Sequence, residues 1–129
     1  MTLTKIAAAT LALGLTLAPA FGANLPSPAG TWQITSGESR YEVEMCGDGT
    51  ALCATLVWLR DDVRTPENMA YLNKMVVVEA EQARPLKWEG QVTYEGKSYR
   101  GNITLLDGNT LRMAGCKAVA CESMIFNRV

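Results

Sequence analysis

The chain has 129 residues, with 12 basic and 13 acidic side chains, a net charge of −1 and no histidine. This balance excludes a basic footprint for nucleic acid and a polybasic membrane anchor. The missing histidine removes the commonest general base and the commonest metal ligand. The length suits one small domain.

The first segment has the pattern of a signal peptide. Lys5 supplies a positive start, residues 6–17 are an apolar run, and small residues at 18–22 suit cleavage. The apolar run is too short to span a bilayer comfortably, which disfavours a transmembrane helix. We therefore expect export to the periplasm or the medium. The expected division is a signal peptide over 1–22, an irregular lead-in over 23–29 and one β domain over 30–129.

The rest of the chain shows the alternation of apolar and polar side chains that is typical of strands. The predicted strands are 30–35, 39–46, 52–59, 71–80, 87–94, 98–105, 110–115 and 121–129. Turn residues separate several of them, at 47–49, 95–96 and 107–109. The long polar stretch 60–70 is predicted to be a loop, and a short helix over 67–73 is a weaker alternative.

About eight short strands joined by tight turns indicate an all-β sandwich or an antiparallel up-and-down barrel. Nearly every strand has one apolar and one polar face. A closed barrel satisfies this pattern because it has one interior and no free edges. We therefore predict the barrel.

The four cysteines predict disulfide bonds, because an exported chain meets an oxidising compartment. Four cysteines allow three pairings. Their spacing favours the two local pairs, Cys46–Cys53 and Cys116–Cys121, each closing a hairpin. Zinc and a reactive thiol are the rival interpretations, but neither spacing is the C-x-x-C of such motifs.

A resemblance to a known family rests on short motifs in a fixed order. The motifs are Gly30-Thr31-Trp32, Cys46 with Leu52-Cys53, Trp88-Glu89-Gly90, Tyr94 with Gly96-Lys97-Ser98-Tyr99, and Phe126-Asn127-Arg128-Val129. From Gly30 to Val129 the chain resembles the bacterial exported family called domain of unknown function 2147. The resemblance implies a lipocalin-like (calycin) barrel. By analogy with lipocalins it also implies that Arg128 packs over Trp32 at the closed end as a structural pair.

The predicted barrel directs a set of large side chains inward, where they either fill the core or hold a small apolar or amphipathic ligand. This putative ligand-binding set is Trp32, Tyr41, Met45, Trp58, Trp88, Tyr94, Tyr99 and Met113. A filled or nearly filled interior is the simpler expectation, and ligand binding follows from analogy of fold alone.

No catalytic motif stands out, so we expect a protein that is not an enzyme and needs no cofactor. Asp61, Asp62 and Glu67 are most simply solvated loop acids, so no metal site is expected. The alternative function is a protein-interaction or inhibitor-like envelope module that presents the acidic 60–70 loop. Neither hypothesis involves nucleic acid or a membrane span in the mature protein.

Overall fold

The computed structural model describes residues 25–94 and 96–129. The predicted signal peptide lies outside the described residues, and residues 25–29 have no regular secondary structure. The strands are β1 (Gly30–Ile34), β2 (Ser39–Cys46), β3 (Ala51–Leu59), β4 (Met75–Arg84), β5 (Lys87–Tyr94), β6 (Lys97–Asp107), β7 (Thr110–Lys117) and β8 (Ala120–Arg128).

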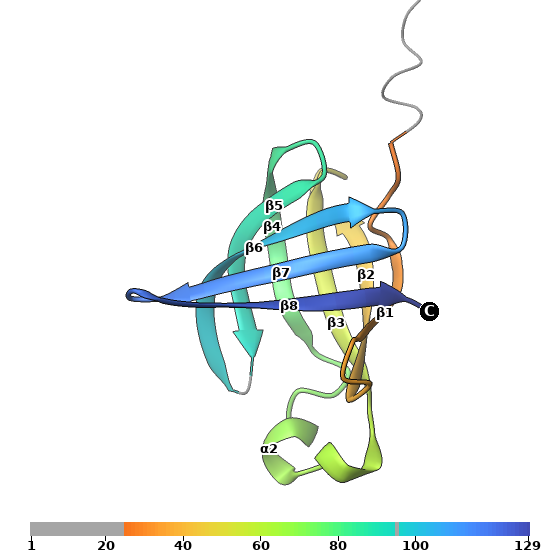
Figure 1. Ribbon diagram of the computed structural model, residues 1–129, viewed down its shortest axis with the longest axis vertical. Coiled ribbons are helices and arrows are strands. Elements are labelled where there is room, and N and C mark those ends of the chain that lie inside the picture. Colours follow the sequence, from red (N-terminus) through yellow and green to blue (C-terminus); the bar gives the residue numbers. More distant parts are fainter. Residues whose placement is uncertain (1–24, 95) are drawn as a thin grey trace, which may run out of the picture.

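Each strand pairs antiparallel with the next one along the chain, and β1 pairs with β8, so the sheet closes into a barrel (Figure 1). The closing contact sets Trp32 opposite Arg128 and Ile34 opposite Phe126. This confirms the predicted eight-stranded antiparallel up-and-down barrel. Closure pairs the edge strands with one another, which removes the free edges of the sheet.

The polar stretch predicted as a loop contains two short helical turns, a 3₁₀ turn over Asp61–Val63 and α2 over Pro66–Met69. The Thr65 hydroxyl accepts a hydrogen bond from the Asn68 N–H at 3.2 Å, and Pro66 takes the first helical position. A capping threonine followed by proline is a strong local helix start. The predicted loop over 60–70 was therefore wrong over these residues, and the alternative helix over 67–73 overlaps α2 at residues 67–69.

A row of three glycines crosses the wall formed by β5, β6 and β7. Gly90 pairs with Gly101, and Gly101 pairs with Gly115. A Cβ atom added to Gly101 would lie 2.7 Å from the carbonyl oxygen of Ala114, which is too close for any side chain. Glycine in a strand interior commonly marks a sharp bend or a close approach of backbones. Here it permits the close approach of β6 to β7.

The closed end of the barrel is packed by two tryptophans. Trp32 is fully buried, and its indole N–H donates to the carbonyl of Pro28 at 2.8 Å. Trp88 is 3% exposed and donates to the carbonyl of Thr50 at 2.8 Å. Buried indole N–H groups need such partners. The lead-in residues and the β2–β3 turn therefore supply carbonyls that complete this end.

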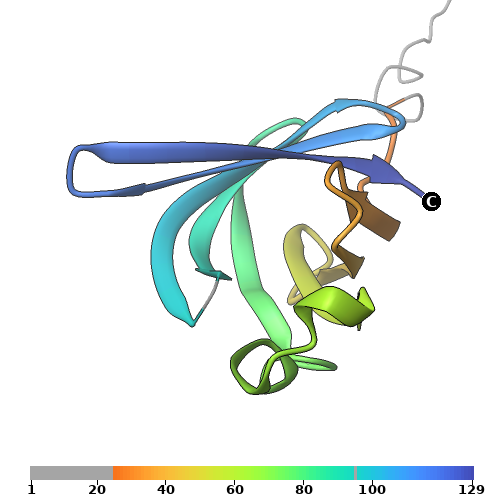
Figure 2. The same cartoon turned by 60° about the horizontal axis from the view of Figure 1, so that its bottom comes forward.

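Both predicted disulfides are confirmed. Cys46 joins Cys53 across the β2–β3 hairpin, with Cα atoms 6.0 Å apart. Cys116 joins Cys121 across the β7–β8 hairpin, with Cα atoms 4.0 Å apart. The β7–β8 hairpin projects beyond the barrel wall in both ribbon views (Figures 1 and 2). The second disulfide therefore links its two strands beside the turn, away from the core.

Candidate functional site

One end of the barrel, its mouth, holds a space lined by residues of β1 to β5 and of the segment carrying α2. Figure 2 shows this segment beside that end. This mouth is where β3 and β5 end and where β2 and β4 begin. Three neighbouring spaces lie there, and Tyr94 lines all of them. Tyr94 ends β5 directly before the turn to β6, and this position brings its side chain to the mouth.

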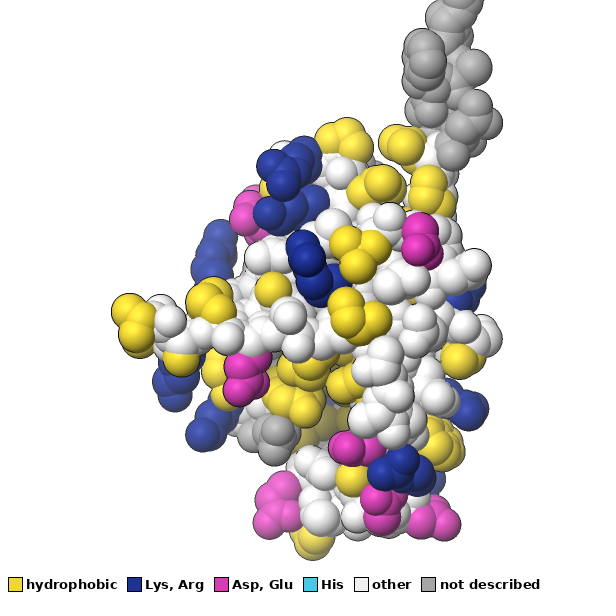
Figure 3. All heavy atoms as spheres, viewed as in Figure 1, with side chains coloured by type: hydrophobic (Ala, Val, Ile, Leu, Met, Phe, Trp, Pro, Cys, Tyr) yellow, Lys and Arg dark blue, Asp and Glu magenta, His cyan; other side chains and the backbone are white. Residues whose placement is uncertain are grey.

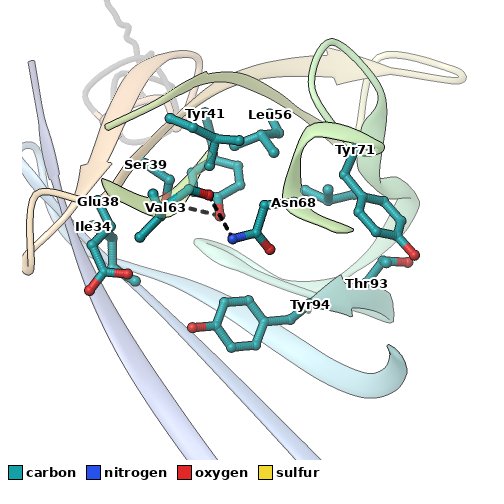
Figure 4. A pocket seen from close by; sticks show the side chains of 12 residues that line it. Ile34, Glu38, Ser39, Tyr41, Leu56, Val63, Asn68, Tyr71, Thr93 and Tyr94 are labelled. Atoms are coloured by element: carbon teal, nitrogen blue, oxygen red, sulfur yellow. Dashed lines mark hydrogen bonds between the residues drawn. The ribbon is translucent and has the colours of Figure 1, made fainter. Parts of the chain in front are cut away.

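The first of these, the mouth space, has a volume of about 220 Å³. Its polar lining comes from Ser39, Asn68 and Thr93, together with the tyrosines at 41, 71 and 94 (Figure 4). Asn68 and Tyr71 belong to the α2 segment and its following turn. The Asn68 amide donates to the carbonyl of Val63 at 2.8 Å, which holds this segment together beside the mouth.

Beneath it lies the deep space, which is small, at about 40 Å³, and lined almost entirely by apolar side chains. Trp32 lines it from the closed end, with Phe126 and Met113 among its walls. The barrel below the mouth is therefore nearly filled by its own side chains, as the simpler expectation from the sequence had it. The deep space therefore offers an apolar surface directly beneath the mouth space.

The side groove, the third space, has a volume of about 250 Å³ and lies along the β7–β8 hairpin. Tyr99, Met113 and Met124 give it an apolar floor, and Lys117 and Glu122 line it as well. Figure 3 shows hydrophobic side chains in the hollow between this hairpin and the α2 segment. Methionines suit an adaptable apolar surface because their side chains are unbranched and flexible.

The tyrosines and the buried tryptophans lie in different parts of the barrel. All four tyrosines of the chain, at 41, 71, 94 and 99, line the mouth space or the side groove. Two of the three tryptophans, Trp32 and Trp88, are buried toward the other end. Tyrosine combines an apolar ring with a polar tip, so it suits a boundary between water and an apolar interior.

Tyr41 joins the polar mouth to the apolar interior. Its phenol oxygen accepts a hydrogen bond from the buried Ser39 hydroxyl at 3.2 Å. Its ring meets that of Phe126 edge-on, with centroids 5.5 Å apart. Burial raises the pKa of Tyr41, the Ser39 hydrogen bond lowers it, and the negative charge of Glu38 raises it, with a net rise. The phenol therefore stays protonated at neutral pH.

Most residues of the predicted inward set face the interior, but they do not form one site. Trp32, Tyr41, Tyr94 and Met113 line the deep space, and Tyr99 lines the side groove. Met45 packs against the core, and Trp88 belongs to it, near the closed end. The structure therefore separates the predicted set into mouth residues and closed-end packing.

Trp58 was predicted to point inward, and this was wrong. The pairing of β2 with β3 shifts at Arg40 and Tyr41: Tyr41 faces Leu56, whereas Arg40 faces Trp58. The extra residue, Val57, forms a β-bulge, and such a bulge reverses the alternation beyond it. Trp58 therefore lies on the outer face, where the Arg40 guanidinium sits 4.5 Å from the ring centroid.

The sequence analysis missed the residues that the α2 segment contributes, above all Asn68 and Tyr71. Asn68 lies in the predicted loop, where no alternation indicated its direction. Tyr71 was placed at the start of the predicted strand 71–80, which was wrong there, because β4 begins at Met75. The Thr65-Pro66 helix start was the available signal for local order. Within residues 25–94 and 96–129, no group of three or more His, Cys, Asp or Glu side chains could hold a metal ion. In the same ranges, no helix is long and apolar enough to cross a bilayer.

The comparison with protein families decides what this barrel belongs to. A family described as "Uncharacterized protein conserved in bacteria (DUF2147)" matches residues 30–128. The match runs from the first strand of the barrel to the last. The chain belongs to this family. The resemblance noted from the sequence is thereby confirmed.

The DUF2147 barrel is also similar in fold to a solved structure. It is similar to the protein described as "Protein HP1028 from the human pathogen Helicobacter pylori belongs to the lipocalin family". The TM-score is 0.61 and the sequence identity 10%, over 81% of the DUF2147 chain and 84% of the other. At this identity the likeness shows the fold alone, and it confirms the lipocalin-like barrel. No match was found among curated proteins.

Proposed function

We propose that this chain is an exported binding protein that holds one small amphipathic ligand at the open end of its barrel. The proposal includes export to the periplasm or the medium. Two disulfides and the pattern of residues 1–22 support it, because disulfides persist in oxidising compartments. The ligand's apolar part occupies the deep space, and its polar part stays among the hydroxyl groups of the mouth space.

The observation that carries this proposal is the gradient of polarity at the mouth. The deep space has an apolar lining, and the mouth space directly above it presents Ser39, Asn68 and Thr93. The two spaces share Tyr41, Val76, Thr93 and Tyr94 as walls, so they adjoin one another. Ligand sites are typically concave and apolar, with a few placed polar groups that fix orientation.

The alternative, a protein-interaction module using the acidic 60–70 loop, has weaker support. Asp62 is held by Arg60 through contacts of 2.5 and 2.8 Å. The same segment contributes Val63 and Asn68 to the wall of the mouth space. Asp62 is thus paired within the loop, and the same segment forms part of the wall of the mouth space, which favours a role in shaping the ligand site.

A fluorescent apolar dye, N-phenyl-1-naphthylamine, tests the proposal. We expect the folded protein to bind it with a micromolar Kd, which is ordinary for a small pocket. Ala54→Leu adds volume to the wall of the deep space and should weaken binding by about tenfold, or ~1.4 kcal/mol. Trp58→Ala, on the outer face, is the matched control and should bind as the parent does.

Two results would overturn the proposal. One is a folded parent protein that does not raise the dye's fluorescence at any concentration. The other is an equal loss of binding in Ala54→Leu and Trp58→Ala. Should Ala54→Leu fail to fold, Tyr94→Ala takes its place, because Tyr94 lines all three spaces.

A further inference from the structure

The walls of the mouth space include three aromatic rings from three separate parts of the chain. Tyr41 comes from β2, Tyr71 from the turn after α2, and Tyr94 from the end of β5 (Figure 4). The face of an aromatic ring carries negative partial charge and attracts cations. Several rings around one space are the arrangement that recognises alkylated ammonium groups.

The Tyr71 side chain reaches a part of the chain outside the α2 segment. A Cβ atom added to Gly96 would lie 3.3 Å from the Tyr71 hydroxyl, so this hydroxyl packs against the β5–β6 turn. The α2 segment and the β5–β6 turn thus approach each other through one tyrosine. This contact keeps the Tyr71 ring at the mouth and reduces the conformational freedom that a ligand would otherwise have to remove.

The lining of the mouth space carries negative charge. Among the described residues that line it, Glu38 is the one charged side chain, and it is half-buried. It is close enough to Tyr41 that its negative charge contributes to the raised pKa of that phenol. A carboxylate beside aromatic rings, with no lysine or arginine in the lining, makes the space attractive to a cation and unfavourable to an anion.

Two basic side chains lie near the mouth space, and each has an acidic partner of its own, although the positive charge of Arg60 also acts on Glu38. Arg60 makes the two-point contact with Asp62 and donates to the carbonyl of Ser36 at 3.1 Å. Arg64 donates to the carbonyl of Leu59 at 3.0 Å and lies 3.8 Å from Asp61. Neither lines the mouth space. Neither arginine therefore supplies the partner that an anionic head group would require there.

From these observations we propose that the mouth space binds the head group of a cationic amphiphile, an alkylated ammonium ion, between Tyr41, Tyr94 and Glu38. This inference rests on the proposed function, because the apolar tail of the same ligand occupies the deep space. It adds the chemical class of the head group. A carboxylate head group would be repelled by Glu38, with no cation in the lining to offset the repulsion. A neutral head group would gain no attraction from the charge of Glu38.

Three octyl compounds that differ only in the head group test the inference: octyltrimethylammonium, octanoate and 1-octanol. Each is titrated, below the concentration at which it forms micelles, against protein carrying N-phenyl-1-naphthylamine. Octyltrimethylammonium should displace the dye at about a tenfold lower concentration than either competitor. The difference in displacing concentration between octyltrimethylammonium and the other two compounds should shrink as salt is added, because exposed charges are screened.

Glu38→Gln keeps the shape of the side chain and removes its charge. It should abolish most of the preference for octyltrimethylammonium and leave displacement by 1-octanol unchanged. Tyr94→Leu should reduce the same preference by removing one ring from the wall. Glu67→Gln is the matched control, because Glu67 is an exposed acid on the α2 segment and does not line the mouth space.

The outcomes separate this inference from the proposed function. If 1-octanol displaces the dye as well as octyltrimethylammonium does, or octanoate displaces it better, the head-group inference fails and the binding function stands. Equal effects of Glu38→Gln and Glu67→Gln also overturn the inference. If the dye does not bind the folded protein at all, both proposals fail.

Discussion

The guanidinium of Arg128 lies 4.4 Å from the centroid of the Trp32 ring, so the last strand of the barrel covers a tryptophan of the first. The same side chain donates to the carbonyls of Gly108 at 2.9 Å, Ala29 at 2.7 Å and Ser27 at 2.8 Å. One arginine thus joins the lead-in residues, the β6–β7 turn and the closed end. This is the pair that the resemblance to lipocalins implied.

Replacing Arg128 with alanine should lower the free energy of unfolding by about 2 to 3 kcal/mol, because a cation over an aromatic ring and three charged hydrogen bonds are lost together. Urea denaturation followed by tryptophan fluorescence measures the loss. Arg112→Ala removes an exposed arginine from β7 and should change the same free energy by less than about 0.5 kcal/mol. Equal losses in the two variants would contradict the role given to Arg128.

Gly101→Ala should destabilise the barrel by about 1 to 3 kcal/mol, because the new methyl group overlaps backbone that has no room to move. The added Cβ would lie 2.7 Å from the Ala114 carbonyl oxygen and 3.2 Å from a methyl group of Val92. Gly108→Ala is the control, since a Cβ there meets nothing within 4 Å. Thermal unfolding should separate the two variants, and coinciding midpoints would refute the close approach.

The two disulfides should be reduced in a fixed order, because access of the reductant controls the rate of exchange. Cys116 and Cys121 are both exposed, whereas Cys53 is 2% exposed and accepts a hydrogen bond from the Glu79 N–H at 3.3 Å. Brief treatment with dithiothreitol followed by alkylation should label Cys116 and Cys121 first. Peptide mass spectrometry reads out the order, and earlier labelling of Cys46 and Cys53 would contradict it.

The stability of the barrel should depend on Tyr41 at alkaline pH. The pKa of Tyr41 is raised in the folded protein, mainly by burial, so the folded state retains a proton that the unfolded state releases near its ordinary value of about 10. The stability that this proton provides is fully present below about pH 10 and is lost as the pH rises from there through the folded pKa.

Tyr41→Phe should therefore flatten the fall in stability above about pH 10. At neutral pH it should cost about 1 kcal/mol, because the buried Ser39 hydroxyl loses its acceptor. Denaturation midpoints at a series of pH values, together with phenolate absorbance, provide the measurement. Tyr71→Phe serves as the control. An alkaline decline of unchanged slope in Tyr41→Phe would show that other groups cause it.

The sequence predicted the barrel well because apolar and polar side chains alternate along each strand. This local pattern is the same in an open sheet and in a closed barrel. In β6 the inward set of Gly101, Ile103 and Leu105 followed directly from that alternation, and all three are buried. Trp58 was misplaced because one extra residue, Val57, reverses the alternation, and nothing in the local composition marks a bulge there.

The mouth was harder to predict because several of the residues that line it lie outside the regular strands. Asn68 and Tyr71 reach it from a helical turn and the residues that follow, and Glu38 lies just before β2. Their meeting depends on how separate parts of the chain are placed once the barrel has closed. Tyr41 and Tyr94, by contrast, could be assigned from strand pattern, since they lie on regular strands.

The separation of tyrosine from tryptophan also gives the protein two distinct optical reporters. The indoles of Trp32 and Trp88 are buried in the core below the mouth, so their emission follows unfolding of the whole barrel. The phenol rings surround the space where a guest molecule would sit, so near-ultraviolet ellipticity from tyrosine follows occupancy. A titration that moves the tyrosine bands without the red shift of indole emission that exposure to water produces would record loading of an intact barrel.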